Sequence, residues 1–226
     1  MSQLALPLRT ADYAVFDSFW NAGNETAVAY LQELVGAAET PGCWLSGPAT
    51  SGKTHLLQAV CERMGDRSVY LPLRDLAEAG PGILEGMALR PVVCIDDITS
   101  VAGQPDWEHA LFDFWHQLSD AQGTLVLASR ATVRESGFEL ADLQSRFSQL
   151  AVFQLRTLDE NELARALQMR ARHRGLELPD QTARYMLSRS RRDMASLYKL
   201  LDHLDAEALR TQRRLTVPFV KTVMPG

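Results

Sequence analysis

The sequence predicts an α/β fold in which a P-loop parallel β-sheet flanked by helices is followed by a small helical domain. Three observations support this prediction. Residues 47–54 (GPATSGKT) fit the phosphate-binding pattern G-x-x-x-x-G-K-[ST]. Short apolar runs alternate with amphipathic helical segments up to about residue 156, which is typical of a parallel sheet with helices on its faces. Beyond that point the apolar residues recur at helical spacing.

The composition narrows the class of protein. A chain of 226 residues with 46% hydrophobic and 23% charged residues can bury a sizeable core in one large or two small domains. The net charge of −5 argues against a broad nucleic-acid surface, so we interpret the arginine-rich segments 165–174 and 184–192 as solvated helix faces. No signal peptide or transmembrane run is visible, and the three cysteines lack metal or disulfide spacing. We expect a cytoplasmic protein without membrane contact.

The first elements give the phosphate-loop pattern the context that it needs. A helix is expected from Asn24, as its N-cap, to about residue 39. A short strand at 43–46 then precedes the loop, and a helix at 53–64 follows it. The positive end of that second helix would face the phosphates. A glycine loop without a ligand is the alternative interpretation.

The loop residues suggest individual roles. Gly47 and Gly52 let backbone N–H groups turn toward phosphate oxygens, and Lys53 reaches the β- and γ-phosphates. The Thr54 hydroxyl is placed to hold Mg²⁺. Our predicted nucleotide-binding set is completed by further polar residues: Ser51, His55 and Asn24.

Two aspartates are predicted to lie at the carboxyl edge of the sheet. After a strand at 68–72 and a short helix around 83–88, the apolar run 91–95 ends in Asp96 and Asp97. Asp96 would bind Mg²⁺ through water and complement Thr54. Asp97 lies where many ATPases carry a glutamate that polarises the attacking water, and its shorter side chain would orient that water less well. The alternative is a pair of acidic residues that only open a loop.

The rest of the sheet domain contributes two weaker signals. We expect a helix at 106–119, strands at 124–128 and 152–155, and a helix at 140–150 between those strands. Ser129 closes the first of these strands and is a possible sensor of the γ-phosphate. Arg146 near the end of the later helix could act as an arginine finger on a neighbouring subunit's nucleotide, although a surface arginine fits the sequence equally well.

The remaining chain is expected to form a helical domain. A capping box at 157–160 would open a helix reaching about residue 174. Helices at 180–188 and 193–210 and a final turn at 216–220 would follow. We therefore divide the chain into a flexible tail at 1–10, an α/β domain at 11–156 and a helical domain at 157–226. The tail contains apolar residues that need somewhere to be buried.

Together these features resemble the AAA+ proteins of the DnaA-like branch, and within it the Hda family of regulatory inactivators of DnaA. The similarity extends over almost the whole chain and is carried by these segments: 16–24, 47–57 (GPATSGKTHLL), 92–98 (VVCIDDI), 143–147 (LQSRF), 174–179 (RGLELP) and 212–221 (QRRLTVPFVK).

The resemblance implies a negative regulator of replication initiation. Such a protein binds ADP or ATP with Mg²⁺, docks on the replicative sliding clamp, and promotes hydrolysis of DnaA-bound ATP in trans. Arg146 matches the arginine-finger position, and the helical domain matches the lid. The terminal peptide is similar to clamp-docking peptides, through Gln3, Leu4, Leu6, Pro7 and Leu8. The chain ends after the lid, so we expect no DNA-binding domain of its own; homo-oligomers remain possible.

Departures from the family pattern affect the sensors. Arg130 stands where the family usually has an aspartate, and Ala195 aligns with the expected lid arginine, for which Arg192 is the candidate substitute. Both changes suit a protein that holds nucleotide for its shape more than for turnover. Two other hypotheses stay open: an independent AAA+ ATPase such as a helicase loader, and a nucleotide-binding module with unrelated partners.

Overall fold

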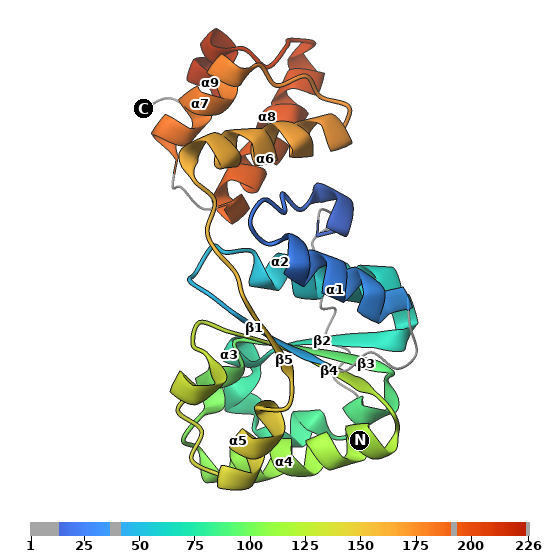
Figure 1. The fold of residues 1–226 in the computed structure, drawn as a ribbon. Helices are drawn as coiled ribbons and strands as arrows, with labels where there is room; N and C mark the ends of the chain where they lie inside the picture. Colours follow the sequence, from blue (N-terminus) through green and yellow to red (C-terminus); the bar gives the residue numbers. More distant parts are fainter. Residues whose placement is uncertain (1–13, 37–41, 191–193, 225–226) are drawn as a thin grey trace. The chain divides into compact units, whose positions relative to one another are not determined.

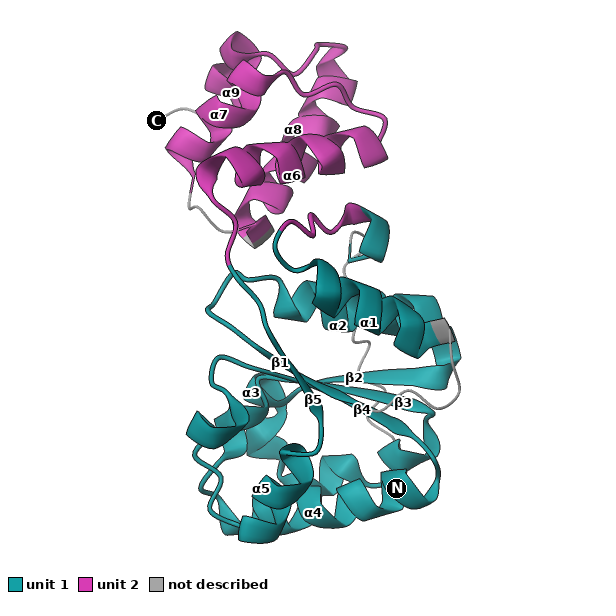
Figure 2. Cartoon of the chain, viewed as in Figure 1, with its two compact units in different colours: residues 1–17, 23–156 teal, residues 18–22, 157–226 magenta. Residues whose placement is uncertain are grey.

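The computed structural model describes residues 14–36, 42–190 and 194–224 (Figure 1). These residues form two compact units (Figure 2). The α/β unit comprises the described residues up to Asp17 together with Gly23–Arg156. The helical unit comprises Ser18–Ala22 and the chain from Thr157 onward. The predicted tail at 1–10 lies outside the described residues.

A five-stranded parallel sheet in the order β2-β3-β4-β1-β5 forms the centre of the α/β unit. Its strands have these bounds: β1 Cys43–Ser46, β2 Ser68–Pro72, β3 Val92–Asp96, β4 Thr124–Ser129 and β5 Ala151–Gln154. The inner strands β1 and β3 are buried at every position, as expected for strands covered on both faces. The register pairs Ser46 with Ser129 and Pro72 with Asp96, which brings the carboxyl ends of the strands to one edge.

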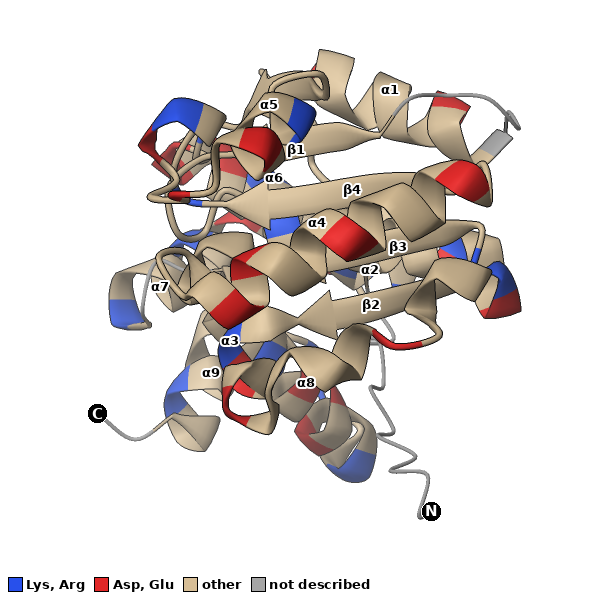
Figure 3. Ribbon diagram, turned by 90° about the horizontal axis from the view of Figure 1, so that it is seen from below, with Lys and Arg blue, Asp and Glu red and all other residues tan. Residues whose placement is uncertain are grey.

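Helices cover both faces of this sheet (Figure 1). One face carries α1 and α2, and the other carries α3, α4 and α5, with these bounds: α1 Glu25–Gly36, α2 Lys53–Met64, α3 Leu73–Leu76, α4 Pro105–Asp120 and α5 Ala141–Phe147. Figure 3 shows α4 across its face of the sheet, with acidic positions along the helix. The arrangement confirms the predicted parallel sheet flanked by helices.

An aromatic cluster packs α5 against the sheet. The Phe147 side chain is 1% exposed, and its ring centroid lies 5.6 Å from that of Trp44 on β1. The rings of Phe138 and Trp115 also contact Phe147, with centroids at 5.3 and 6.1 Å. Large buried aromatic rings contribute much of the hydrophobic stabilisation of a core. Phe147 therefore fixes the position of the short helix α5.

The helical unit contains four α-helices among its described residues: α6 Glu160–His173, α7 Asp180–Arg189, α8 Met194–Thr211 and α9 Val217–Val223. Their apolar stripes meet in a core that includes Leu167, Met186, Leu201 and Phe219. Arg170 is buried among them, where its guanidinium lies over the Tyr198 ring at 5.3 Å. None of the described helices in either unit is long and apolar enough to cross a membrane.

Several local predictions were wrong in detail. The expected helix at 83–88 is replaced by two 3-10 turns, Pro81–Leu84 and Met87–Leu89. Between them Gly86 adopts a φ of +75°, a left-handed conformation that ends a helix. The expected helix at 140–150 is shorter, because α5 ends at Phe147 and β5 begins at Ala151.

Two helix termini in the helical unit also differ from expectation. The capping box of α6 is formed by Asp159 and Glu162, two residues after the predicted pair. The predicted final turn at 216–220 is instead the helix α9, whose N-cap Thr216 makes no side-chain capping bond. Proline at the start of α9 has the fixed φ that a first helical turn requires.

Candidate nucleotide site

The loop between β1 and α2 adopts a conformation that depends on its glycines. Gly47 has a φ of +150° and Gly52 a φ of +93°. A Cβ at Gly47 would lie 2.5 Å from the Leu155 carbonyl oxygen, so a side chain would collide with the backbone there. Gly52 is the N-cap of α2, whose first backbone N–H groups are available to an anion. The loop is thus built as a phosphate cradle.

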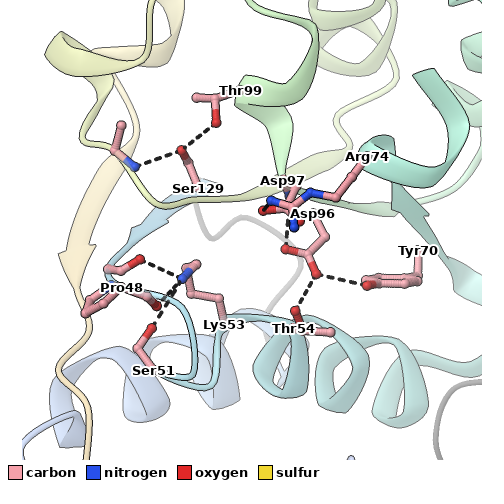
Figure 4. Close-up of polar contacts among 12 residues, drawn as sticks. Pro48, Ser51, Lys53, Thr54, Tyr70, Arg74, Asp96, Asp97, Thr99 and Ser129 are labelled. Carbon is pink, nitrogen blue, oxygen red and sulfur yellow. Dashed lines mark hydrogen bonds and ion pairs between the residues drawn. The ribbon is translucent and has the colours of Figure 1, made fainter. Parts of the chain in front are cut away.

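Lys53 is buried and folded onto this loop (Figure 4). Its Nζ donates to the carbonyl oxygens of Gly47 at 2.7 Å and Pro48 at 2.8 Å, and to Ser51 Oγ at 3.3 Å. Burial lowers the pKa of Lys53, while the negative charges of Asp96 and Asp97 oppose that shift. The ammonium group is therefore preorganised beside the loop and can exchange carbonyl oxygens for phosphate oxygens.

The Asp96 carboxylate joins the loop helix to the sheet. This side chain is buried, and its Oδ2 accepts hydrogen bonds from Thr54 Oγ1 at 2.6 Å and from Tyr70 Oη at 2.9 Å (Figure 4). Its Oδ1 accepts the Asp97 backbone N–H at 3.0 Å. Three donors compensate much of the cost of burying a carboxylate. The structure thus brings together the two residues predicted to hold Mg²⁺.

Tyr70 is a site residue that sequence reasoning missed. It lies on β2, two residues before Pro72, the register partner of Asp96. Burial and the charge of Asp96 both raise the pKa of Tyr70, so its hydroxyl stays protonated and donates. A tyrosine in a strand gives no signal of this role without the pairing of β2 with β3.

The donor set suits a magnesium ion. The Thr54 hydroxyl and the Asp96 carboxylate supply hard oxygen ligands, and they are hydrogen-bonded to each other at 2.6 Å. Magnesium keeps several waters and uses few protein ligands beside nucleotide phosphates. These two residues therefore fit the metal, and the contact of Asp96 with it through water stays a prediction. The ion itself would neutralise phosphate charge.

Asp97 is held in a constrained and charged environment. It has a φ of +50° and is the N-cap of the 3-10 turn Ile98–Val101. Its Oδ1 forms an ion pair with Arg74 of α3 at 3.1 Å. Burial is the largest cause that raises the pKa of Asp97, followed by the Asp96 charge, whereas Arg74, Arg130 and Lys53 oppose the shift. Arg74 was not predicted to take part.

Ser129 ends β4 beside the strand that leads into the phosphate loop. Its buried hydroxyl lies 3.1 Å from Thr99 Oγ1 and accepts the Ala131 backbone N–H at 3.0 Å (Figure 4). The serine is therefore fixed within the carboxyl edge of the sheet. Its role as a sensor stays a prediction.

The other two predicted nucleotide-binding residues contact the chain around the site. The Asn24 side chain donates from Nδ2 to the Arg156 carbonyl oxygen at 3.2 Å and accepts the Arg156 backbone N–H at 2.9 Å. His55 Nε2 lies 2.9 Å from the Val15 carbonyl oxygen. Both side chains hold backbone segments in place, and their contact with nucleotide stays a prediction.

Arg146 lies apart from this site. It is in the last turn of α5, on the face of the sheet opposite α2 (Figure 1). Its side chain is half-buried and no ion pair joins it to another described residue. Arg192 and the tail residues 3–8 lie outside the described residues, and of Ala195 only the backbone within α8 is described.

Comparison with known proteins identifies relatives of each part. Residues 159–224 match the family described as "Hda, lid domain". The chain is similar in structure to domain III of the Thermotoga maritima replication initiation protein DnaA, with a TM-score of 0.75, 19% identity, and coverage of 95% of this chain and 96% of that one. AMPPCP-bound DnaA from Aquifex aeolicus gives a TM-score of 0.70 and 19% identity, covering 89% and 68%.

A second kind of relative shares the fold. The Thermotoga maritima RuvB Holliday junction branch migration motor matches with a TM-score of 0.60 and 20% identity, covering 92% of this chain and 72% of that one. The structural matches to these proteins, together with the lid match, confirm the predicted combination of an AAA+ sheet domain and a helical lid.

Replacing Lys53 tests the phosphate cradle. We expect Lys53→Ala to weaken binding of ADP and ATP roughly 10- to 100-fold, because a charge-assisted hydrogen bond contributes about 1.5–3 kcal/mol. Isothermal titration with each nucleotide, followed by size-exclusion chromatography of the complexes, measures the change. Lys221→Ala, an exposed lysine of α9, is the matched control and should bind as the wild type does. Unchanged affinity in Lys53→Ala would exclude this loop as the site.

Replacing Arg74 tests the electrostatics of Asp97. Because the guanidinium opposes the upward shift, Arg74→Ala should raise the pKa of Asp97 further. Titration of the Asp97 carboxyl carbon by NMR measures it. The folded-state pKa is raised, so the charged carboxylate costs stability above that pKa, and this cost disappears as the pH falls through it. Arg63→Ala, an exposed arginine of α2, should leave the pKa in place.

Proposed function

Because residues 159–224 match the Hda lid-domain family and the chain shares its fold with domain III of DnaA, we propose that it is an Hda-like negative regulator of replication initiation that promotes hydrolysis of DnaA-bound ATP. In this proposal it binds nucleotide in its own loop, and Arg146 acts as an arginine finger on the nucleotide of DnaA. The proposal places the protein in the cytoplasm with the replication machinery and leaves a second copy of the chain as a possible additional partner.

The proposal is based on one observation: α5, which carries Arg146 in its last turn, lies on the face of the sheet opposite α2, the helix that follows the phosphate loop (Figure 1). We propose that an arginine on this helix acts on another protein's nucleotide and not on the chain's own. It has no carboxylate partner among the described residues that would have to be displaced first. A guanidinium supplied in trans stabilises charge that develops during phosphoryl transfer.

The nucleotide has a structural role in this proposal. The Aquifex DnaA relative is bound to AMPPCP, which supports a nucleotide as the ligand here. We propose that this ligand is ADP or ATP with Mg²⁺. The groups that would contact it are those of the cradle and the edge carboxylates: Gly47, Ser51, Gly52, Lys53, Thr54 and Asp96. Because each is anchored to the sheet or to α2, a bound nucleotide would stabilise the loop conformation described above.

Weak turnover by the chain itself fits the surroundings of Asp97. Its carboxylate is one methylene shorter than a glutamate and is already paired with Arg74 at 3.1 Å. The ion pair occupies a carboxylate oxygen that would otherwise orient the attacking water. We therefore propose that intrinsic hydrolysis is slow relative to the hydrolysis that the protein promotes in DnaA.

The tail is proposed to tether the protein to the replicative sliding clamp. Gln3 would hydrogen-bond at the edge of a pocket that is filled by Leu4, Leu6, Pro7 and Leu8. Tethering raises the local concentration of the regulator near the replication machinery. This part of the proposal rests on the sequence pattern.

An independent ATPase, such as a helicase loader, is the second candidate function. The observation in its favour is the intact link between Thr54 and Asp96 at 2.6 Å, the pair expected to serve a catalytic metal. Turnover of ATP by the purified protein alone, at a rate that DnaA does not change, would favour it over the regulator.

Replacing Arg146 tests the regulator directly. With DnaA preloaded with labelled ATP, the wild-type protein should accelerate a single turnover, and Arg146→Ala should reduce that acceleration by roughly 10³-fold or more. Arg146→Lys should also lose most of the acceleration, because a lysine lacks the planar fork of donors. Arg134→Ala, an exposed arginine of the same domain, is the matched control. Full acceleration by Arg146→Ala would remove the proposal.

Replacing tail residues tests the tether. We expect the sliding clamp to capture the wild-type protein, and the double variant Gln3→Ala with Leu6→Ala to abolish capture because both the hydrogen bond and an apolar anchor are lost. Surface plasmon resonance on immobilised clamp measures the binding, and Arg9→Ala in the same segment serves as control. Persistent binding by the double variant would refute the docking peptide.

A further inference from the structure

Glu108 of α4 carries a buried carboxylate outside the nucleotide site. The residue is 2% exposed, and its Oε1 accepts the Gly103 backbone N–H at 2.7 Å. Its Oε2 accepts the N–H groups of Glu139 at 2.9 Å and Leu140 at 2.6 Å, and Oε1 also lies 3.1 Å from the Glu139 nitrogen. The Glu108 carboxylate therefore connects α4 to the segment at Gly103 and to the segment at Glu139 and Leu140, through their backbone N–H groups.

Because the Glu108 carboxylate is buried, its stability depends on these hydrogen bonds. Burying a carboxylate costs several kcal/mol unless its oxygens are satisfied, and charge-assisted bonds to N–H groups are stronger than neutral ones. An apolar or amide side chain at 108 would leave backbone donors without an acceptor. The carboxylate also lies at the start of α5, whose N-cap is Leu140, where negative charge is favoured.

The segments that Glu108 joins lead to two functional parts of the α/β unit. Gly103 follows the 3-10 turn Ile98–Val101, which begins at Asp97 and contains Thr99, the partner of Ser129. Glu139 and Leu140 lead directly into α5, and Arg146 is in the last turn of that helix. With seven residues α5 is too short to be stable alone, so its position depends on its attachments.

We infer that Glu108 is a positioning residue for Arg146, connecting the segment after Asp97 to the segment before α5. The aromatic packing of Phe147 fixes one side of α5, and the Glu108 carboxylate fixes its beginning. Without the carboxylate the start of α5 loses its acceptor and the guanidinium is displaced from the geometry that a finger requires. This inference rests on the proposed role of Arg146.

The experiment compares Glu108→Gln with the control Glu139→Gln, an exposed carboxylate whose backbone, not its side chain, makes the contact. DnaA preloaded with ATP is titrated with each protein. We expect Glu108→Gln to lower the plateau rate roughly 10- to 100-fold, as misplacement of a reacting group does, with an unchanged half-saturating concentration. Partial unfolding alone would instead raise the half-saturating concentration and spare the plateau.

Two further measurements keep the inference falsifiable. Amide hydrogen exchange should accelerate at Gly103, Glu139 and Leu140 in Glu108→Gln, whereas the nucleotide affinity of the variant should equal that of the wild type. In the background of Arg146→Ala, adding Glu108→Gln should lower the plateau no further, because both changes act on one guanidinium.

The outcomes separate the two proposals. If Arg146→Ala abolishes the acceleration but Glu108→Gln leaves the plateau unchanged, the positioning role is wrong and the proposed function stands. An additive loss in the double variant also overturns the positioning role. If Arg146→Ala has no effect, the proposed function fails, and the inference about Glu108 fails with it.

Discussion

The buried carboxylate of Asp96 is the interaction on which the site depends. It is the meeting point of α2, β2 and β3, through Thr54, Tyr70 and the backbone of Asp97. Parallel strands bring these groups to one edge, and burial makes their hydrogen bonds obligatory. Loss of any donor would loosen the attachment of the phosphate-loop helix to the sheet. The edge at which we propose that nucleotide binds is thereby part of the core.

The proposed function assigns nucleotide binding and catalysis to different parts of the α/β unit. The phosphate loop holds the Lys53 side chain by hydrogen bonds. Asp97 forms an ion pair with Arg74, and the positive charges of Arg74 and Arg130 oppose the rise in its pKa. Arg146, which we propose as an arginine finger, belongs to α5 on the face opposite α2 (Figure 1). In the proposed function the protein holds its own nucleotide without efficient turnover, and this arginine acts on another protein's nucleotide.

The sequence predicts most of the fold because its signals are local. The phosphate loop is predicted by its sequence motif. The pattern of apolar residues predicts the helix at 53–64 and the buried strand that ends at Asp96. Tyr70, Arg74 and Glu108 escaped prediction, since their roles arise from strand register and tertiary contacts between segments distant in the sequence. The prediction of a helix at 83–88 was wrong for a local reason, because Gly86 adopts a left-handed conformation that interrupts a helix.

In the proposed function, the chain's own Asp97 is dispensable for the hydrolysis of DnaA-bound ATP. The most direct measurement is the rate at which ATP preloaded on DnaA is hydrolysed in the presence of Asp97→Asn, a variant that keeps the shape of the side chain and removes its charge. We expect acceleration equal to that of the wild-type protein. A loss of acceleration in Asp97→Asn, with its nucleotide affinity intact, would mean that the chain's own phosphate loop takes part in the hydrolysis.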